Sequence, residues 1–215
     1  MRILLCGGAG YIGAHAYVVL VERGHDVVVA DNFSNSAPGV LARLQQITGH
    51  PVPFQPLDLR DREAVVGFFA RQHFDAVVHF AALKAVGESC ERPLDYFHNN
   101  ISGTLNLLHG MQSAGVKRLV FSSSATVYGD PSSVPVREDA RLQVTNPYGR
   151  TKLVMEELIG DLCASDPGFH AANLRYFNPV GAHTSGLIGE DPTGTPNNLM
   201  PYICQVAAGR RDHLS

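Results

Sequence analysis

Short apolar, β-branched runs alternate along the chain with longer amphipathic stretches. The apolar runs predict six strands, at residues 3–6, 27–30, 52–55, 76–80, 119–122 and 171–176. The longer stretches predict helices at residues 11–23, 40–48, 62–72, 93–114, 147–164 and 199–208. Strands that alternate with helices are typical of a parallel sheet covered by helices on both faces. The pattern therefore predicts an α/β fold built on a doubly wound parallel sheet.

Glycine, asparagine and proline mark several ends of the predicted helices. Gly24 follows the first helix and Gly115 follows the fourth, where a left-handed residue often ends a helix. Asn146 and Pro147 offer an N-cap and a first-turn proline for the fifth helix. These positions predict where three of the helices begin or end.

The composition changes abruptly after Tyr176, toward Gly, Pro, Asn and Thr. We interpret this stretch as a loop at the carboxyl ends of the strands, where open α/β sheets bind ligands. A chain of 215 residues is long enough for one sizeable α/β domain and a little more. We therefore predict a nucleotide-binding domain over residues 1–176 and the start of a smaller, substrate-binding region over residues 177–215.

Composition and charge point to an ordinary soluble globular protein. The chain has 45% hydrophobic and 17% charged residues and a formal net charge of -3, which offers no field for gathering nucleic acid. No apolar stretch is long enough to span a membrane, and the first strand begins at once, so we expect no signal peptide and a cytoplasmic location. The cysteines are scattered singly and the histidines show no ligand-like pairing, which favours reduced thiols and no metal site.

Three glycines at three-residue spacing, Gly7, Gly10 and Gly13, follow the first apolar run. Asp31 closes the next apolar run. This layout is typical of a dinucleotide site: glycines let the backbone approach a pyrophosphate at a helix N-terminus, and the acid accepts hydrogen bonds from the ribose hydroxyls. A carboxylate there would repel a 2′-phosphate, which favours NAD over NADP. The alternative is a glycine turn that only lets helix and strand pack closely.

Tyr148 and Lys152 lie four residues apart near the start of the fifth predicted helix, hence on one face. The ordinary pKa of tyrosine, near 10, is too high for a base at neutral pH, but a nearby cation and the positive helix end both favour the phenolate. Ser122, Ser123 and Ser124 follow the fifth predicted strand beside the same crevice. Alternatively, the pair is a surface contact and the serines are turn residues.

Several longer strings carry a more specific signal: residues 7–13, 31–32, 79–89, 122–129, 148–152, 175–182 and 196–201. With these strings the chain resembles the extended short-chain dehydrogenase/reductases and, within them, the UDP-sugar 4-epimerases. The resemblance covers essentially the whole chain. It implies a Rossmann-like domain that binds NAD and interconverts UDP-glucose and UDP-galactose, a reaction of galactose metabolism, through transient oxidation at the sugar C4.

The resemblance also implies roles for individual residues. Asp58 and Leu59 would flank the adenine, and Asn99 would lie beneath the cofactor. The expected cofactor contacts are Gly7, Gly10, Tyr11, Ile12, Gly13, Asp31, Asn32, Asp58, Leu59, Phe80, Ala81, Lys84, Asn99, Ser122, Tyr148, Lys152 and Tyr176. The expected substrate contacts are Lys84, Ser124, Ala125, Thr126, Tyr148, Asn178, Asn198 and Leu199, and the expected catalytic residues are Tyr148, Lys152 and Ser124.

Residue types after Ser124 help to choose among the reactions of the family. Dehydratases of similar sequence carry an Asp-Glu pair there, which supplies the acid and the base for loss of water. This chain has Ala125 and Thr126 instead, and neither performs that proton transfer. With a phenol and a hydroxyl as the available groups, the sequence favours reversible oxidation of a sugar alcohol.

The chain ends at Ser215, whereas proteins of the family continue through most of a substrate-binding domain. We therefore expect it to bind NAD, to epimerise poorly, and to leave apolar surface uncovered. A non-catalytic NAD-binding unit and a 4-epimerase of another UDP-sugar, N-acetylated or pentose, remain alternatives. Residues 93–114 and 147–164 are long enough to pair in a homodimer, although their apolar faces equally suit packing on the sheet.

Overall fold

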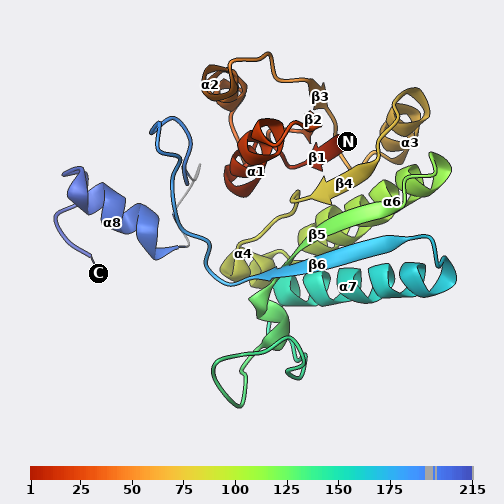
Figure 1. The fold of residues 1–215 in the computed structure, drawn as a ribbon. Helices are drawn as coiled ribbons and strands as arrows, with labels where there is room; N and C mark the ends of the chain where they lie inside the picture. The colour runs from red at the N-terminus through yellow and green to blue at the C-terminus, as the bar shows by residue number, and fades with distance from the viewer. Residues whose placement is uncertain (192–195, 197, 215) are drawn as a thin grey trace.

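Six parallel strands form one sheet in the order β3-β2-β1-β4-β5-β6 (Figure 1). The computed structural model describes residues 1–191, 196 and 198–214. The strands are β1 (Arg2–Cys6), β2 (Asp26–Asp31), β3 (Phe54–Pro56), β4 (Ala76–His79), β5 (Arg118–Ser124) and β6 (His170–Tyr176). This is the doubly wound strand order of dinucleotide-binding sheets, so the predicted fold class is confirmed.

Helices cover both faces of the sheet. The α-helices of the described residues are α1 (Tyr11–Glu22), α2 (Gly39–Thr48), α3 (Arg62–Arg71), α4 (Val86–Glu91), α5 (Pro93–Tyr96), α6 (Gly103–Ser113), α7 (Pro147–Ser165) and α8 (Leu199–Ala207). In Figure 1, α1 and α2 lie on one face, while α3, α6 and α7 lie on the other. Successive side chains of β1 enter two different cores: Leu4 packs with α3, α6 and α7, and Leu5 packs with α1 and α2. Burial on both faces explains why β1 is apolar throughout.

The single helix predicted over residues 93–114 is wrong in detail. The stretch comprises α5, a π-helix η1 (Phe97–Ser102) and α6. Buried Asn100 lies in the widened π-turn, where its amide oxygen accepts from the Leu83 N–H at 2.8 Å and its amide nitrogen donates to the Leu83 carbonyl at 3.0 Å. A side chain that bonds to a neighbouring loop is a known cause of such local distortion. The short α4 and the 3-10 helix η2 (Ala125–Tyr128) were not predicted.

The helix ends predicted from Gly24, Gly115 and Asn146 are confirmed. Gly24 and Gly115 have φ of +80° and +69°, in the left-handed region that glycine adopts freely. The Asn146 side chain accepts a hydrogen bond from the Gly149 N–H at 2.8 Å, and Pro147 is the first residue of α7. This cap fixes the first turn of α7, which carries Tyr148.

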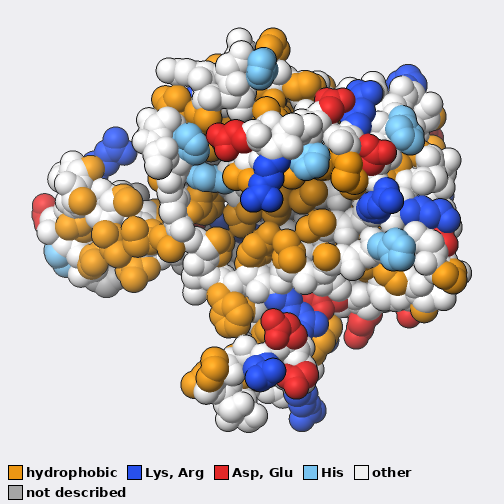
Figure 2. Space-filling view, in the orientation of Figure 1, with side chains coloured by type: hydrophobic (Ala, Val, Ile, Leu, Met, Phe, Trp, Pro, Cys, Tyr) orange, Lys and Arg blue, Asp and Glu red, His pale blue; other side chains and the backbone are white. Residues whose placement is uncertain are grey.

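The C-terminal part of the described chain lies beside the sheet rather than on it. Strand β6 is an edge strand and is exposed over most of its length. In Figures 1 and 2, α8 stands apart from the main body and presents hydrophobic side chains, with Leu199 65% exposed. Within the described residues, no helix combines the length and apolarity needed to cross a membrane. The domain boundary at residues 176 and 177 stays a prediction.

Candidate active site at the carboxyl ends of the strands

A cavity of about 940 Å³ opens at the carboxyl ends of the strands. Every residue expected to contact the cofactor lines this cavity, from Gly7 in the glycine turn to Tyr176 at the end of β6. Six of the expected substrate contacts line it too: Lys84, Ser124, Thr126, Tyr148, Asn178 and Asn198. The structure therefore brings together side chains from five strand ends and from α7, while their individual roles stay predictions.

Two expected substrate contacts, Ala125 and Leu199, do not reach the cavity among the described residues. Leu199 begins α8, which lies away from the main body. Ala125 begins η2, and it is the next residue, Thr126, that lines the cavity. Asn197, part of the string at residues 196–201, lies outside the described residues.

The glycine turn between β1 and α1 is shaped by close backbone approach. Gly7 has φ of +75°, and a Cβ there would lie 2.5 Å from the backbone nitrogen of Ala81. A Cβ on Gly13 would lie 2.2 Å from the carbonyl oxygen of Gly7. Gly10 precedes the first turn of α1, which no side chain of the described residues caps. The N–H groups at this helix end are thus available to an anion in the cavity, as a pyrophosphate requires.

Asp31, at the end of β2, has more protein partners than the sequence suggested. Its carboxylate accepts hydrogen bonds from the Ala9 N–H at 3.1 Å, the Phe33 N–H at 2.8 Å and the Ser36 hydroxyl at 3.1 Å. An ionised carboxylate offers about four acceptor positions, so it can still accept from a ribose hydroxyl. Asp31 thus anchors the loop after β2 as well as facing the cavity.

Asp58 lines the cavity after β3 and forms a close ion pair. Its carboxylate lies 2.6 Å from the Arg60 Nη2 and also accepts from the Arg60 Nε. Hydrogen bonds from the Arg60 side chain lower the pKa of Asp58 to about 2. The Asp58 carboxyl is therefore ionised at neutral pH, and the Arg60 guanidinium offsets its charge.

Ser124, Tyr148 and Lys152 come together where β5 and α7 meet. The Ser124 hydroxyl accepts from the Thr126 hydroxyl at 3.0 Å and is placed to donate to the Tyr148 oxygen. The Lys152 Nζ donates to the Ser122 carbonyl at 2.7 Å and lies 5.9 Å from the centre of the Tyr148 ring. The predicted helical spacing is therefore correct, and the serine run does lie against it.

Burial, rather than the nearby cation, dominates the ionisation of this cluster. Tyr148 is 8% exposed and Lys152 is 3% exposed. Burial raises the pKa of Tyr148 above its ordinary value, although the hydrogen bond from Ser124 acts the other way. Burial also lowers the pKa of Lys152 to about 7. Burial thus opposes the phenolate that Lys152 and the positive helix end were expected to favour, because a dry site disfavours both charges. The role of Lys152 stays a prediction.

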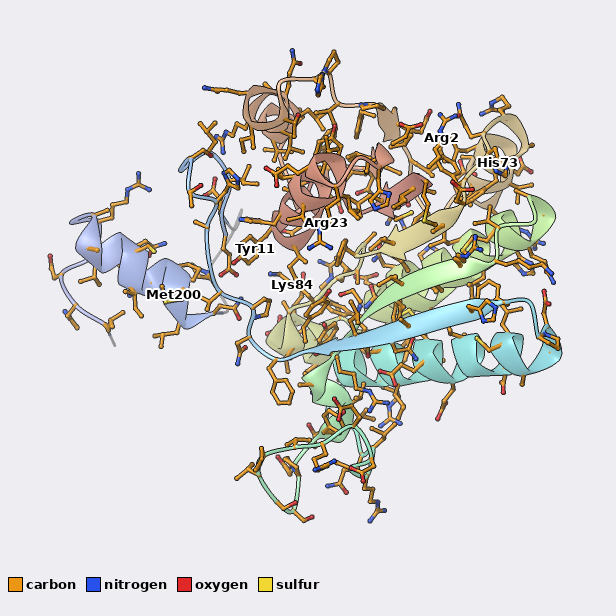
Figure 3. The ribbon with its side chains drawn as sticks, viewed as in Figure 1. Arg2, Tyr11, Arg23, His73, Lys84 and Met200 are labelled. Carbon is orange, nitrogen blue, oxygen red and sulfur yellow. The ribbon has the colours of Figure 1, made fainter. Side chains whose placement is uncertain are left out.

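The loop after β6 reaches back across the cavity toward α1. The Tyr11 hydroxyl donates to the Gly181 carbonyl at 2.7 Å, and Ile188 is buried in the core that contains α1. Figure 3 shows Tyr11 and Lys84 facing the same space. The Lys84 Nζ lies 3.8 Å from a Glu190 oxygen, which also accepts from the Asn198 amide at 2.6 Å. The prediction of a ligand-side loop is thus consistent with its position.

Two groups of buried polar residues beside the cavity were missed from the sequence. Asn100 donates to the Thr151 hydroxyl at 3.0 Å and so connects η1 to α7. Glu156, also on α7, pairs with Arg175 of β6 at 2.7 Å. The spacing of Lys152 and Glu156, four residues apart on one helix, was a signal that could have found the second group.

Comparison with known proteins agrees with this geometry. The model of the NAD dependent epimerase/dehydratase family matches residues 3–214. UDP-glucose 4-epimerase from Bacillus subtilis is 55% identical over 215 residues, which are 100% of this chain and 63% of that protein. The mouse UDP-glucose 4-epimerase is 52% identical over 221 residues, covering 100% of this chain and 64% of that protein.

Solved structures are similar over the same range. The UDP-glucose 4-epimerase of Stenotrophomonas maltophila, with bound NAD and formylated UDP-arabinopyranose, superposes with a TM-score of 0.96 at 55% identity, over 100% of this chain and 64% of that one. The Bifidobacterium longum enzyme, in complex with NAD+ and UDP, gives 0.95 at 47% identity, over 99% and 64%. The chain spans 63% of the length of the first of these curated relatives. The family match over nearly the whole chain establishes that it belongs to the NAD dependent epimerase/dehydratase family.

Proposed function

We propose that the cavity binds NAD. The glycine turn fits a pyrophosphate, because the turn lines the cavity and no side chain caps the start of α1 beside it. Asp31 has acceptor capacity left for a ribose hydroxyl, and its charge disfavours a 2′-phosphate. Similar structures that contain NAD support the same cofactor.

We further propose that the chain carries the catalytic groups of a UDP-sugar 4-epimerase, an isomerase that interconverts UDP-glucose and UDP-galactose. The observation that carries this proposal is the cluster of Ser124, Tyr148 and Lys152 in the same cavity as the glycine turn. The identity of 55% to a UDP-glucose 4-epimerase supports the choice of substrate. Ala125 and Thr126 oppose a dehydratase, since neither supplies an acid or a base for loss of water.

In the proposed mechanism Tyr148 is the base that removes the proton from the C4 hydroxyl of the sugar. NAD held at the glycine turn and Asp31 would supply the acceptor, and later the donor, of the C4 hydride. The Ser124 hydroxyl bridges the C4 oxygen and the Tyr148 oxygen, so it guides the proton between them. Loss of a proton and a hydride leaves a ketone at C4; after the sugar turns over, Tyr148 gives the proton back as the hydride arrives on the opposite face.

The inversion requires that Tyr148 keep its proton until the sugar has turned. Burial raises the pKa of Tyr148, so the neutral phenol is the stable form after Tyr148 has taken the proton from the sugar. Lys152 stabilises the phenolate at the start of the reaction, provided that it is charged.

The test is turnover of UDP-galactose by the purified chain with NAD supplied, followed through a coupled UDP-glucose dehydrogenase. We expect slow turnover that Tyr148→Phe lowers by at least about a hundredfold, because a positioned base contributes roughly that much. NAD affinity, measured by calorimetry, should remain within about twofold, since the change removes one hydroxyl and keeps the ring.

Tyr128→Phe is the matched control, because Tyr128 is also buried but its hydroxyl bonds to Arg175 rather than to Ser124. Near-normal turnover in Tyr148→Phe would refute the assignment of the base. Bound NAD without any turnover would instead favour a cofactor-binding unit as the function of this chain.

A further inference from the structure

Glu156 is a buried carboxylate one helical turn beyond Lys152 on α7. Its side chain is 6% exposed. The Ser123 hydroxyl donates to it, and Arg175 donates from Nε at 3.1 and 3.2 Å and from Nη2 at 2.7 Å. A buried carboxylate is costly unless it is fully hydrogen-bonded, and this one is held from two strands at once.

These contacts lead directly to the catalytic cluster. Ser123 lies between Ser122, whose carbonyl accepts from the Lys152 Nζ, and Ser124, whose hydroxyl bonds to Tyr148. Glu156 is therefore bonded to the residue that separates the two site groups of β5. A change at Glu156 acts on both groups through one residue.

The surroundings of Lys152 explain why a nearby carboxylate matters. Its Nζ lies 5.0 Å from the centre of the Phe121 ring and donates to the Ser122 carbonyl, so it has lost nearly all contact with water. The titratable groups that face it are His79 from β4, and Tyr148 and Glu156 from α7. Burial followed by the charge of Lys152 lowers the pKa of His79 to about 3, so His79 is neutral.

We propose that Glu156 is a positioning residue of the active site: its carboxylate favours the charged form of the buried Lys152 side chain and holds the end of β5 against α7. Among the groups that face Lys152, Glu156 is the acid, and its charge raises the pKa of Lys152 against the effect of burial. The proposal rests on the proposed function in one respect: charged Lys152 is taken to stabilise the Tyr148 phenolate.

Arg175 acts on the charge of Glu156 from the neighbouring strand β6. It pairs with Glu156 from β6, and its Nη1 donates to the Tyr128 hydroxyl at 2.9 Å and to the Glu138 carbonyl at 3.1 Å. Arg175 thus fixes the carboxylate in place while it partly offsets its charge. Removal of Arg175 and removal of Glu156 should therefore move the ionisation of Lys152 in opposite directions.

The sequence makes a direct measurement practical, because it contains three lysines: Lys84, Lys117 and Lys152. Lysine labelled with ¹³C at Cε gives three NMR signals, which Lys→Arg variants assign, and the titration of each signal reports its own ionisation without cofactor or substrate. In Glu156→Gln we expect the midpoint of Lys152 to fall by at least about one pH unit, since a close opposite charge shifts a pKa by roughly that much or more. In Arg175→Met it should rise, while Lys84 and Lys117 stay unchanged.

Glu157→Gln is the matched control, because Glu157 is the next residue on α7 and is exposed. In this variant the titration midpoint of Lys152 should equal that of the parent chain. A purely structural role predicts that both pair-breaking variants move Lys152 in the same direction, and that result would overturn the proposal. If a single variant fails to fold, Glu156→Gln with Arg175→Met removes both charges together. The Lys152 midpoint should still fall, because Arg175 offsets the charge of Glu156 only in part, and a midpoint at or above that of the parent chain would overturn the proposal. Because these titrations need no turnover, their failure is distinct from failure of the proposed epimerase reaction.

Discussion

Gly13 on α1 occupies a position where a larger residue cannot fit unless the backbone moves. A Cβ at this position would lie 2.2 Å from the carbonyl oxygen of Gly7 and 2.7 Å from the Cα of Gly8. Both neighbours are backbone atoms of the glycine turn, so no side-chain rotation relieves the overlap. We therefore expect Gly13→Ala to push the turn away from the start of α1.

Two effects of opposite sign set the size of the change in the free energy of unfolding. Alanine is favoured over glycine inside a helix by about 1 kcal/mol. Overpacking of a well-packed region costs about 1–3 kcal/mol, and an overlap with backbone belongs at the upper end. The net loss is then about 2 kcal/mol. For a chain of this length, that loss lowers Tm by about 4–8 °C.

Thermal unfolding with and without NAD tests both the stability and the cofactor site. At a hundredfold excess over Kd, NAD should add about 2.7 kcal/mol to the parent chain, and Gly13→Ala should lose most of this gain because the phosphate-binding turn has moved. Gly160→Ala on α7 is the matched control: no described atom lies within 4 Å of its new Cβ, so the same change should stabilise by about 1 kcal/mol. A Gly13→Ala chain with the Tm and the NAD response of the parent would refute this reasoning.

Three further changes test other parts of the structure. Asp31→Asn removes a charged acceptor, so calorimetry should show NAD binding weakened roughly tenfold or more and the preference for NAD over NADP reduced; an unchanged ratio would contradict the proposed ribose contact. Burial lowers the pKa of His79 to about 3. Between pH 7 and pH 5 the unfolded chain therefore takes up a proton at His79 that the folded chain does not, which lowers the free energy of unfolding by about 2 kcal/mol. Stability thus falls with falling pH, and urea unfolding should show that His79→Gln loses about 2 kcal/mol less over this interval; equal losses would show that His79 is protonated in the folded chain. Asn146→Ala removes the cap of α7 and should cost about 1 kcal/mol, read from the urea midpoint; no change would mean that water replaces the cap.

The strands were predictable because their physical cause is local. A parallel strand covered on both faces needs apolar residues throughout, and β1 and β2 each carry such a run. Helix α7 was predictable for a different reason, since Asn146 and Pro147 are specific start signals. In both cases a few adjacent residues contain the whole cause.

The break between α5 and α6 was not predictable in this way. It accompanies Asn100, which bonds to Leu83 and to Thr151, 17 and 51 residues away along the chain. The sequence around Asn100 predicts neither partner. The partners of Asp31 show the same limit on a smaller scale, because the loop that it anchors folds back onto it.

The ionisation of Tyr148 and Lys152 was beyond sequence reasoning because it depends on the balance between burial and charge. The spacing of Tyr148 and Lys152 predicts that they share a helix face, but not that both are removed from water. Attraction between two charges would favour the phenolate, whereas the cost of burying both favours the neutral pair. Burial acts against both charges here: it raises the pKa of Tyr148 and lowers the pKa of Lys152.

The phenolate with a charged Lys152 and the phenol with a neutral Lys152 contain the same number of protons. Moving between them shifts one proton across the site and leaves its net charge unchanged, so a change of bulk pH does not by itself select one over the other. The selection depends on fixed charges close by. The carboxylate of Glu156 favours the charged lysine, and a positive group beside Tyr148 in the cavity would favour the phenolate. We therefore expect the ionisation of Tyr148 to respond to the charge of a bound ligand, because charges interact more strongly at a site that is removed from water.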